Sequence, residues 1–164
     1  MDFPGPEYLL RVLEGAARVV RPGGFIFVGD VRNRSTLELF ASSVQLHRSP
    51  AGWSKEQLRQ ALAKQIELEE ELVIDPAFFA AVKRRVPRIG HVEIALKRGR
   101  YRNEMVRFRY NATLFVGGSS PAFRGRRLDW DGEGLSLARL RGILEEQAPE
   151  QLALCEVPNA RTFT

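Results

Sequence analysis

The sequence is poor in the residues that build disulfides and metal sites. Its 164 residues include one cysteine, Cys155, and two histidines, His47 and His91. A single cysteine excludes an internal disulfide, and so few cysteine and histidine side chains make a zinc site hard to assemble. We therefore expect no resident metal, and the simplest compartment for the chain is a reducing cytoplasm.

Long apolar runs are also missing. Runs such as "FIFVG" at 25–29 are far shorter than the roughly 20 apolar residues of a membrane-spanning helix. The first ten residues, "MDFPGPEYLL", lack the basic segment and apolar core of a signal peptide. The sequence thus predicts no membrane partner. Its 44% hydrophobic content is ordinary for a globular protein, and its length suits one domain with at most a short appendage.

Acidic residues are scarce in one region. Thirteen of the 25 lysines and arginines lie between Lys83 and Arg127, where the only acids are Glu93 and Glu104. The rest of the chain is net acidic, although the whole carries a charge of +5. A basic stretch of this kind can attract nucleic acid or an acidic protein. A solvated face with an exposed loop is the plainer alternative.

The first third of the chain has the pattern of an α/β protein. Apolar residues at helical spacing predict a helix over 6–20, and the "RPGG" at 21–24 ends it. The following "FIFVGD" at 25–30 predicts a strand buried on both faces, as in a parallel sheet covered by helices.

Three helices are predicted next, each from a capping signal. Ser35 with Glu38 and Ser54 with Gln57 have the spacing of capping boxes, and the first of these helices leads toward His47. Asp75 followed by proline starts the third helix. We expect the acidic run at 67–71 to be the solvated face of the second helix.

The period changes to two in the second half of the chain. Alternation over 91–97 and again over 105–116 predicts two long strands that form an antiparallel hairpin. We expect a first domain over 1–117 and a linker over 118–128. A small tail over 129–164 would contain a helix from Ser136 and the apolar run "LALCEV". The glycines of "DGEGL" at 131–135 predict a turn, because no buried strand leads into them as a phosphate-binding loop requires.

Few side chains suggest chemistry by themselves. Asp30 follows a buried strand at the edge where open α/β sheets bind ligands, and it would otherwise cap the next loop. His47 is equally consistent with a structural imidazole. Glu104 would either orient a proton or pair with Arg102. Arg109 belongs by alternation to a basic ladder on the sheet surface.

Several segments together resemble a known family. They are "PGPEYLLRVLEGAARVVRPGGFIFVGDVR", "QLHRSP", "EEELVIDPAFF" and "RIGHVEIALKRGRYRNEMVRFRYNATLFVG". They resemble the carboxyl half of class I S-adenosylmethionine-dependent methyltransferases, and more narrowly the methyltransferase domains of nonribosomal peptide synthetases and hybrid polyketide synthetases. "NEMVRFRYNAT" is similar to a core motif N-E-L-x-x-Y-R-Y-x-x-V, from which Met105, Phe108 and Thr113 depart. The resemblance covers about 3–117, and "PNAR" at 158–161 extends it loosely into the tail.

The resemblance implies a fold and a reaction. The fold is a partial Rossmann-like sheet in which residues 25–30 would form the fifth, parallel strand and the hairpin would form the last two strands. The helices of 35–85 would cover the sheet and form part of the substrate lid. The reaction is methyl transfer from S-adenosylmethionine to a nucleophile, most often an amino-acid nitrogen on a peptidyl carrier protein. The sequence does not decide between nitrogen, carbon and oxygen acceptors.

The resemblance also implies roles for individual residues. Asp30, His47 and Glu104 would be catalytic groups near the acceptor, where Glu104 orients an amine and a general base removes its proton. Asn103, Arg109 and Tyr110 would line the substrate site. No cofactor-binding residue can be assigned, because the family's glycine-rich loop and the acidic residue at the end of its second strand are absent from the sequence.

These departures imply the carboxyl half of a methyltransferase domain, inactive without the other half and binding S-adenosylmethionine weakly or not at all. The partners would be a peptidyl carrier protein and neighbouring synthetase domains, and an unpaired sheet edge would favour self-association. A noncatalytic module whose basic hairpin docks a carrier protein is one alternative. Nucleic-acid binding through 97–109 is another, less favoured because Phe108 and Tyr110 fall on the apolar face.

Overall fold

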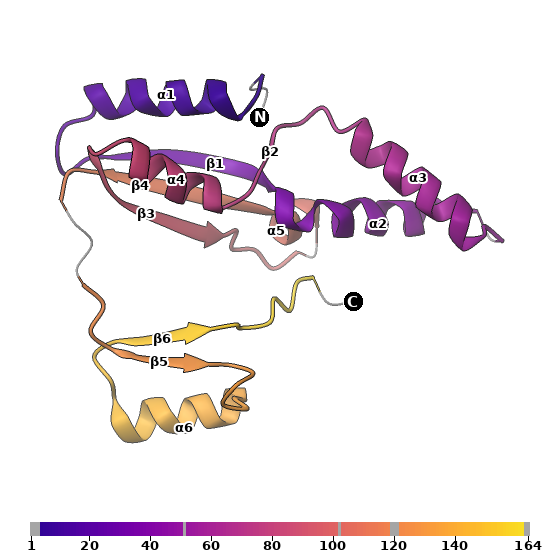
Figure 1. Cartoon of the computed structure of the whole chain (residues 1–164). Coiled ribbons are helices and arrows are strands. Elements are labelled where there is room, and N and C mark those ends of the chain that lie inside the picture. The colour runs from indigo at the N-terminus through magenta and orange to yellow at the C-terminus, as the bar shows by residue number, and fades with distance from the viewer. Residues whose placement is uncertain (1–3, 51, 102, 119–121, 163–164) are drawn as a thin grey trace. The chain divides into compact units, whose positions relative to one another are not determined.

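The chain forms two compact units, residues 1–120 and residues 121–164. The computed structural model describes residues 4–50, 52–101, 103–118 and 122–162 (Figure 1). Among these residues, no helix is long and apolar enough to cross a membrane.

The first unit begins with a helix and a strand close to those predicted. Helix α1 spans Pro6–Val19, with proline in its first turn and Leu9, Leu13 and Ala17 buried at four-residue spacing. After a turn in which Gly23 adopts a φ of +83°, strand β1 runs over Phe25–Asn33, three residues further than predicted.

Four strands form a mixed sheet in the order β2-β1-β4-β3. Strand β2 (Val73–Ile74) is parallel to β1, whereas β4 (Arg109–Val116) is antiparallel to both β1 and β3 (Ile89–Leu96). The α/β class and the antiparallel pairing of the last two strands are confirmed, and the arrangement is compatible with a partial Rossmann-like sheet.

One face of the sheet carries the core. Helix α1 and helix α4 (Ala77–Arg85) pack there against β1, β3 and β4, and the largest fully buried side chains are Tyr110 and Phe79. Their rings meet edge to face with centroids 6.1 Å apart. The Tyr110 hydroxyl donates a hydrogen bond of 3.0 Å to the carbonyl oxygen of Ile74. This bond ties the short β2 segment to the centre of the sheet.

The opposite face is open within the first unit. Phe25 and Phe27 are 59% and 58% exposed, and the Phe115 ring lies 6.4 Å from that of Phe25. The prediction that β1 is buried on both faces is therefore wrong for the described residues. The outer edge of β1 is also largely unpaired among them, because β2 meets β1 only at Arg32 and Asn33.

Helices α2 (Leu37–Arg48) and α3 (Lys55–Glu67) pack against each other and extend beyond the strands (Figure 1). The Ser54 capping box of α3 is confirmed. The Ser35 capping box is wrong: residues 34–36 form a 3₁₀ turn, and the Ser35 hydroxyl instead donates to Asp75 Oδ2 at 2.8 Å. We call α2 and α3 the helical arm. Among its described residues only Ala41 is fully buried.

A short helix, α5 (Glu104–Phe108), stands where the alternation predicted the start of a strand. The Asn103 side-chain oxygen accepts a 3.1 Å hydrogen bond from the backbone N–H of Val106 and so caps this helix. Because residues four apart lie on the same face of a helix, this short helix places Glu104 and Phe108 on one face of α5, just before β4 begins.

The second unit is small. Strands β5 (Arg126–Asp129) and β6 (Leu152–Cys155) pair in parallel, and helix α6 (Leu137–Gln147) connects them. The Ser136 hydroxyl caps α6, as predicted, and residues 131–134 form a turn. The expectation that no buried strand leads into Gly132 and Gly134 is wrong, because β5, with Leu128 fully buried, ends just before this turn. Strand β5 begins within the stretch 118–128 whose composition predicted a linker.

Candidate functional site

Two arginines face each other at one end of the sheet. Arg32 near the end of β1 is paired in register with Arg109 at the start of β4, and Arg32 is only 7% exposed. Two adjacent guanidinium groups repel each other, so their partial burial requires compensating anions. Three carboxylates supply them, and we call the five residues the ion cluster: Arg32, Arg109, Glu69, Glu71 and Glu104.

Glu71 bridges both guanidinium groups. Its Oε2 accepts hydrogen bonds from Arg32 Nε and Nη2 at 3.0 and 2.7 Å, and from Arg109 Nη2 at 2.8 Å. Its Oε1 accepts another from Arg109 Nη1. Partial burial acts to raise the pKa of Glu71, but the hydrogen bonds and charges of Arg109 and Arg32 outweigh it and lower that pKa from 4.5 to about 2. Glu71 is therefore ionised at neutral pH.

Glu104 is held on one side only. Its Oε1 accepts hydrogen bonds from Arg32 Nη2 and Arg109 Nη2, both at 2.8 Å. No described residue donates to its Oε2, and the side chain is 38% exposed. Arg102, the partner considered for it on sequence grounds, lies outside the described residues. Glu104 thus presents a fixed carboxylate with one oxygen available to a ligand.

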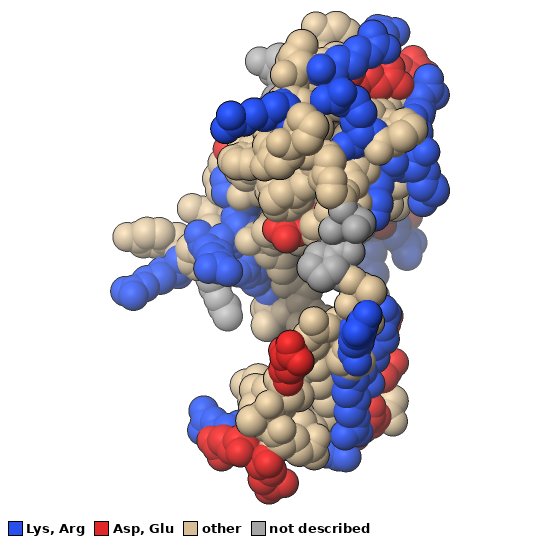
Figure 2. Space-filling model, turned by 90° about the vertical axis from the view of Figure 1, so that its left-hand side faces the viewer, with Lys and Arg blue, Asp and Glu red and all other residues tan. Residues whose placement is uncertain are grey.

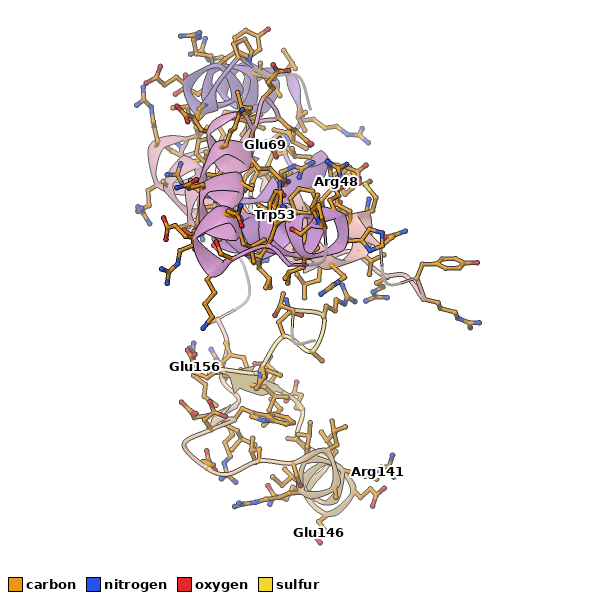
Figure 3. The ribbon with its side chains drawn as sticks, turned by 90° about the vertical axis from the view of Figure 1, so that its right-hand side faces the viewer. Arg48, Trp53, Glu69, Arg141, Glu146 and Glu156 are labelled. Carbon is orange, nitrogen blue, oxygen red and sulfur yellow. The ribbon has the colours of Figure 1, made fainter. Side chains whose placement is uncertain are left out.

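A pocket of about 420 Å³ lies between the helical arm and α5. On α2 its lining follows one helical stripe, and α5 supplies the facing wall. Figure 3 shows this part of the first unit, with labels on Arg48 at the end of α2, Trp53 between α2 and α3, and Glu69 after α3. The lining residues are Phe40, Ser43, Val44, His47, Arg48, Gln65, Asn103, Glu104, Arg107 and Phe108.

The pocket joins the ion cluster through Phe40. The Arg32 guanidinium lies 4.5 Å from the centre of the Phe40 ring, and the Phe108 ring meets Phe40 edge to face at 5.3 Å. Phe40 is therefore held between a cation and a second ring, which fixes that part of the pocket wall.

The structure brings three of the six predicted site residues into this pocket: His47, Asn103 and Glu104. Arg109 lies behind Glu104, bonded to its carboxylate rather than in an exposed basic ladder. Tyr110 lies in the core on the covered face, where burial and the charge of Asp75 raise its pKa.

Asp30 lies apart from the pocket lining, in an irregularity of β1 between Val28 and Val31. It adopts a φ of +58°, a left-handed conformation uncommon for a residue with a side chain. Its backbone N–H donates to Asn111 Oδ1 at 3.1 Å, and its carboxylate pairs with Lys97. The contact with the cluster is through its backbone, since Arg109 Nη1 donates to the Asp30 carbonyl oxygen at 3.2 Å.

Sequence reasoning missed Arg32, Glu69 and Glu71. The run at 67–71 was expected to be solvated, yet Glu69 and Glu71 are largely buried against Arg32. No local pattern marks these pairs, because Arg32 and Glu71 are 39 positions apart. The Asn103 cap was a local signal for the start of α5 at Glu104, but it carries no information about Arg32, Glu69 or Glu71.

Other site types find little support. Among the described residues, no group of three histidine, cysteine or acidic side chains is arranged to hold a metal. Basic side chains gather at the end of the first unit near the α1–β1 turn and the end of α4 (Figure 2), where Arg18, Arg21 and Arg88 are exposed. Phe108 and Tyr110 are buried, so they are not available to stack on bases.

Comparison with known proteins gives a consistent result, although no family model matches the chain. The chain is 42% identical over 166 residues to chondramide synthase cmdD of Chondromyces crocatus, which covers 97% of this chain and 4% of that protein. It is 32% identical over 170 residues to the beauvericin nonribosomal cyclodepsipeptide synthetase of Beauveria bassiana. The match covers 98% of this chain and 5% of that protein.

A third relative is the nonribosomal peptide synthetase kk1B of Curvularia clavata, 35% identical over 172 residues, covering 98% of this chain and 1% of that protein. The chain spans a small part of the length of each relative. It is homologous over nearly its whole length to a short segment of nonribosomal peptide synthetases.

Proposed function

We propose that the chain forms the acceptor-binding part of an S-adenosylmethionine-dependent methyltransferase domain in a nonribosomal peptide synthetase. The acceptor is an aminoacyl or peptidyl group carried on a carrier protein. Two findings support this proposal: the homology to synthetase segments, and the position of the motif "NEMVRFRY", whose Asn103 and Glu104 lie in the pocket lining.

The observation that carries the proposal is the Oε2 atom of Glu104, to which no described residue donates a hydrogen bond. The ion cluster contains two guanidinium groups and three carboxylates, so the cluster by itself has one negative charge in excess, while Arg48 and Arg107 bring positive charge to other parts of the pocket lining. Glu104 is the most exposed of the three acids, and it faces the pocket. An amine N–H is the group that an open carboxylate oxygen in this position accepts best.

The chain's own residues then act on the acceptor in two ways. Glu104 Oε2 accepts a hydrogen bond from the amine and fixes the direction of the nitrogen lone pair, which is how in-line displacement gains most of its rate. His47, on the opposite wall of the pocket, receives the proton that leaves the nitrogen. Arg32 and Arg109 keep the carboxylate of Glu104 from rotating.

The described residues of the first unit do not fit the cofactor. A nucleoside-bearing cofactor of this kind needs a glycine-rich turn from a strand into a helix. In the first unit, β1 leads instead into the turn of residues 33–36, which contains no glycine, and β2 leads into Asp75 and Pro76. In the second unit, β5 does lead through Gly132 and Gly134 into α6, but these glycines do not line the acceptor pocket. We therefore assign the chain to the acceptor side of the site and derive no step through the cofactor.

A methyl-transfer assay tests this proposal. The chain would be compared alone and joined to the polypeptide that flanks the matching segment in a related synthetase whose own segment transfers the label. Each form is incubated with methyl-labelled S-adenosylmethionine and an aminoacyl carrier protein. We expect label on the acceptor only in the joined form, and calorimetric titration of the chain alone should give no micromolar dissociation constant for the cofactor.

Variants identify the residues responsible. Glu104→Gln in the joined form should lower the rate about 100-fold, the scale of a lost acid–base or orienting contact. Glu93→Gln, an exposed acid on β3 outside the pocket, is the matched control and should retain the rate. Transfer that is absent from the joined wild-type chain, or equal in the two variants, contradicts the proposal.

The proposal requires neighbouring synthetase domains and a carrier protein as partners. The exposed phenylalanines and the unpaired outer edge of β1 are suited to contact with further polypeptide. Self-association of the isolated chain through the same edge remains a prediction, which sedimentation velocity at increasing protein concentration checks.

A further inference from the structure

The pocket between the helical arm and α5 has an apolar wall beside its carboxylate. Phe40 and Val44 lie one turn apart on α2, and Phe108 on α5 faces Phe40. Glu104 precedes Phe108 by four residues, so both lie on the same side of α5. A ligand whose amine contacts Glu104 therefore meets the apolar wall within one helical turn.

The size of the pocket restricts the ligands that fill it. Its volume of about 420 Å³ lies within the roughly 300–1,000 Å³ of pockets that enclose drug-sized ligands. A glycyl or alanyl group would leave most of this space to water. An aromatic or branched aliphatic side chain would displace that water from the half-buried Phe40 and Val44, which is favourable in proportion to the apolar area buried.

We propose that the pocket selects aminoacyl acceptors with a bulky apolar side chain, held against Phe40 and Val44 while the amine contacts Glu104. Val44 sets the upper limit on side-chain size. The identity of the acceptor as an aminoacyl group rests on the proposed function, whereas the preference for an amine next to a bulky apolar group rests on the pocket itself.

Val44 is the residue of this wall that can be changed without disturbing the ion cluster. Phe40 is in contact with Arg32, and Phe108 is almost completely buried beside Arg109. Val44 is half-buried on a helix with little core contact, and it has no polar role. Enlarging it therefore narrows the pocket while Glu104 keeps its hydrogen bonds.

The experiment measures binding of amino-acid amides to the chain by NMR titration, without any methyl donor. Glycinamide, alaninamide, leucinamide and phenylalaninamide form the size series, and 3-phenylpropanamide lacks the amine. We expect phenylalaninamide to bind at least about ten-fold more tightly than alaninamide, the discrimination that a few apolar carbons give. Phenylalaninamide should also bind about ten-fold more tightly than 3-phenylpropanamide, because the amine bonds to a carboxylate.

Variants test each end of the pocket separately. Val44→Trp should weaken the binding of phenylalaninamide about ten-fold and change the affinity for alaninamide by no more than about two-fold. Glu104→Gln should weaken the binding of every amide that carries an amine and leave the affinity for 3-phenylpropanamide unchanged. Val12→Trp, an exposed valine on α1, is the matched control for the added ring and should change nothing.

Equal affinity across the size series, or equal weakening of all amides by Val44→Trp, overturns the inference. These outcomes are distinct from failure of the proposed function. A size preference without methyl transfer in the joined form would contradict the methyltransferase proposal alone, and methyl transfer with no size preference would contradict the inference alone.

Discussion

The sheet with its covering helices and the helical arm differ in how their residues are held. In the sheet region, Leu13, Phe79 and Leu114 are fully buried in one continuous core. In the arm, α3 has no buried residue among those described, and Leu46 of α2 is 67% exposed. Such a segment opens at lower free energy than a core strand does. The pocket thus has one wall on the rigid sheet side and one on an adaptable arm.

The ion cluster connects these two regions. Arg32 and Arg109 come from the sheet, whereas Glu69 and Glu71 belong to the segment that follows α3. The core and the ion cluster therefore have different roles. The core stabilises the sheet, and the ion cluster sets the position of the segment after α3, beside the pocket. Three measurements test this division.

The largest effect should come from the core. Leu114→Ala on β4 should lower the free energy of unfolding by about 3–5 kcal/mol, because it removes a fully buried side chain and leaves a cavity. Leu62→Ala, the same change at a half-buried position of α3, should cost about 1 kcal/mol or less. Urea unfolding followed by circular dichroism measures both. Similar losses at the two positions would show that the arm is as tightly packed as the core.

A smaller effect is expected in the cluster. Glu71→Gln removes the charge that compensates both guanidinium groups and should lower the free energy of unfolding by about 2–3 kcal/mol. This is less than the roughly 3–5 kcal/mol for a fully buried pair, because Glu71 keeps some contact with water. Glu67→Gln, an exposed acid at the end of α3, is the control and should be nearly neutral. Equal effects of the two changes would mean that the cluster adds no stability.

The smallest and most specific effect is on pH dependence. The folded state lowers the pKa of Glu71 from 4.5 to about 2, so its contribution to stability is complete above pH 4.5 and disappears as the pH falls toward 2. Glu71→Gln should therefore flatten the decline of unfolding free energy between these pH values. It should not abolish the decline, because hydrogen bonds from Ala77 and Ser35 also lower the pKa of Asp75. An unchanged slope in the variant would show that Glu71 does not titrate in this range.

Local signals predicted much of the fold. The four-residue spacing of α1, the Ser54 capping box and the alternation of β3 and β4 each depend on neighbours in sequence, and each is confirmed. The alternation failed at 105–108, where the Asn103 cap produced a helix instead of a strand. The apolar run at 25–30 predicted a strand correctly but not its open face, since burial depends on what covers a strand and not on the strand's own residues.

The site, like the fold, was predictable only where a local sequence signal marked its residues. His47, Asn103 and Glu104 stood out through motif and position, and they share the pocket. Arg32 and Glu71 did not, because their pairing joins segments far apart in sequence. Tyr110 shares the motif with Glu104, but it lies on the side of the backbone that faces the core.

The ion cluster also bears on how such synthetases can be recombined. Arg32, Glu71 and Arg109 come from three separate segments, yet each guanidinium depends on the same carboxylate. A hybrid whose residues 32 and 109 come from different parent proteins keeps the cluster only where both parents have matching arginines and acids at these positions. Exchange points beyond the end of β4 at Val116 would keep the set from one parent. Crossovers there should yield working hybrids more often than crossovers between α2 and β4.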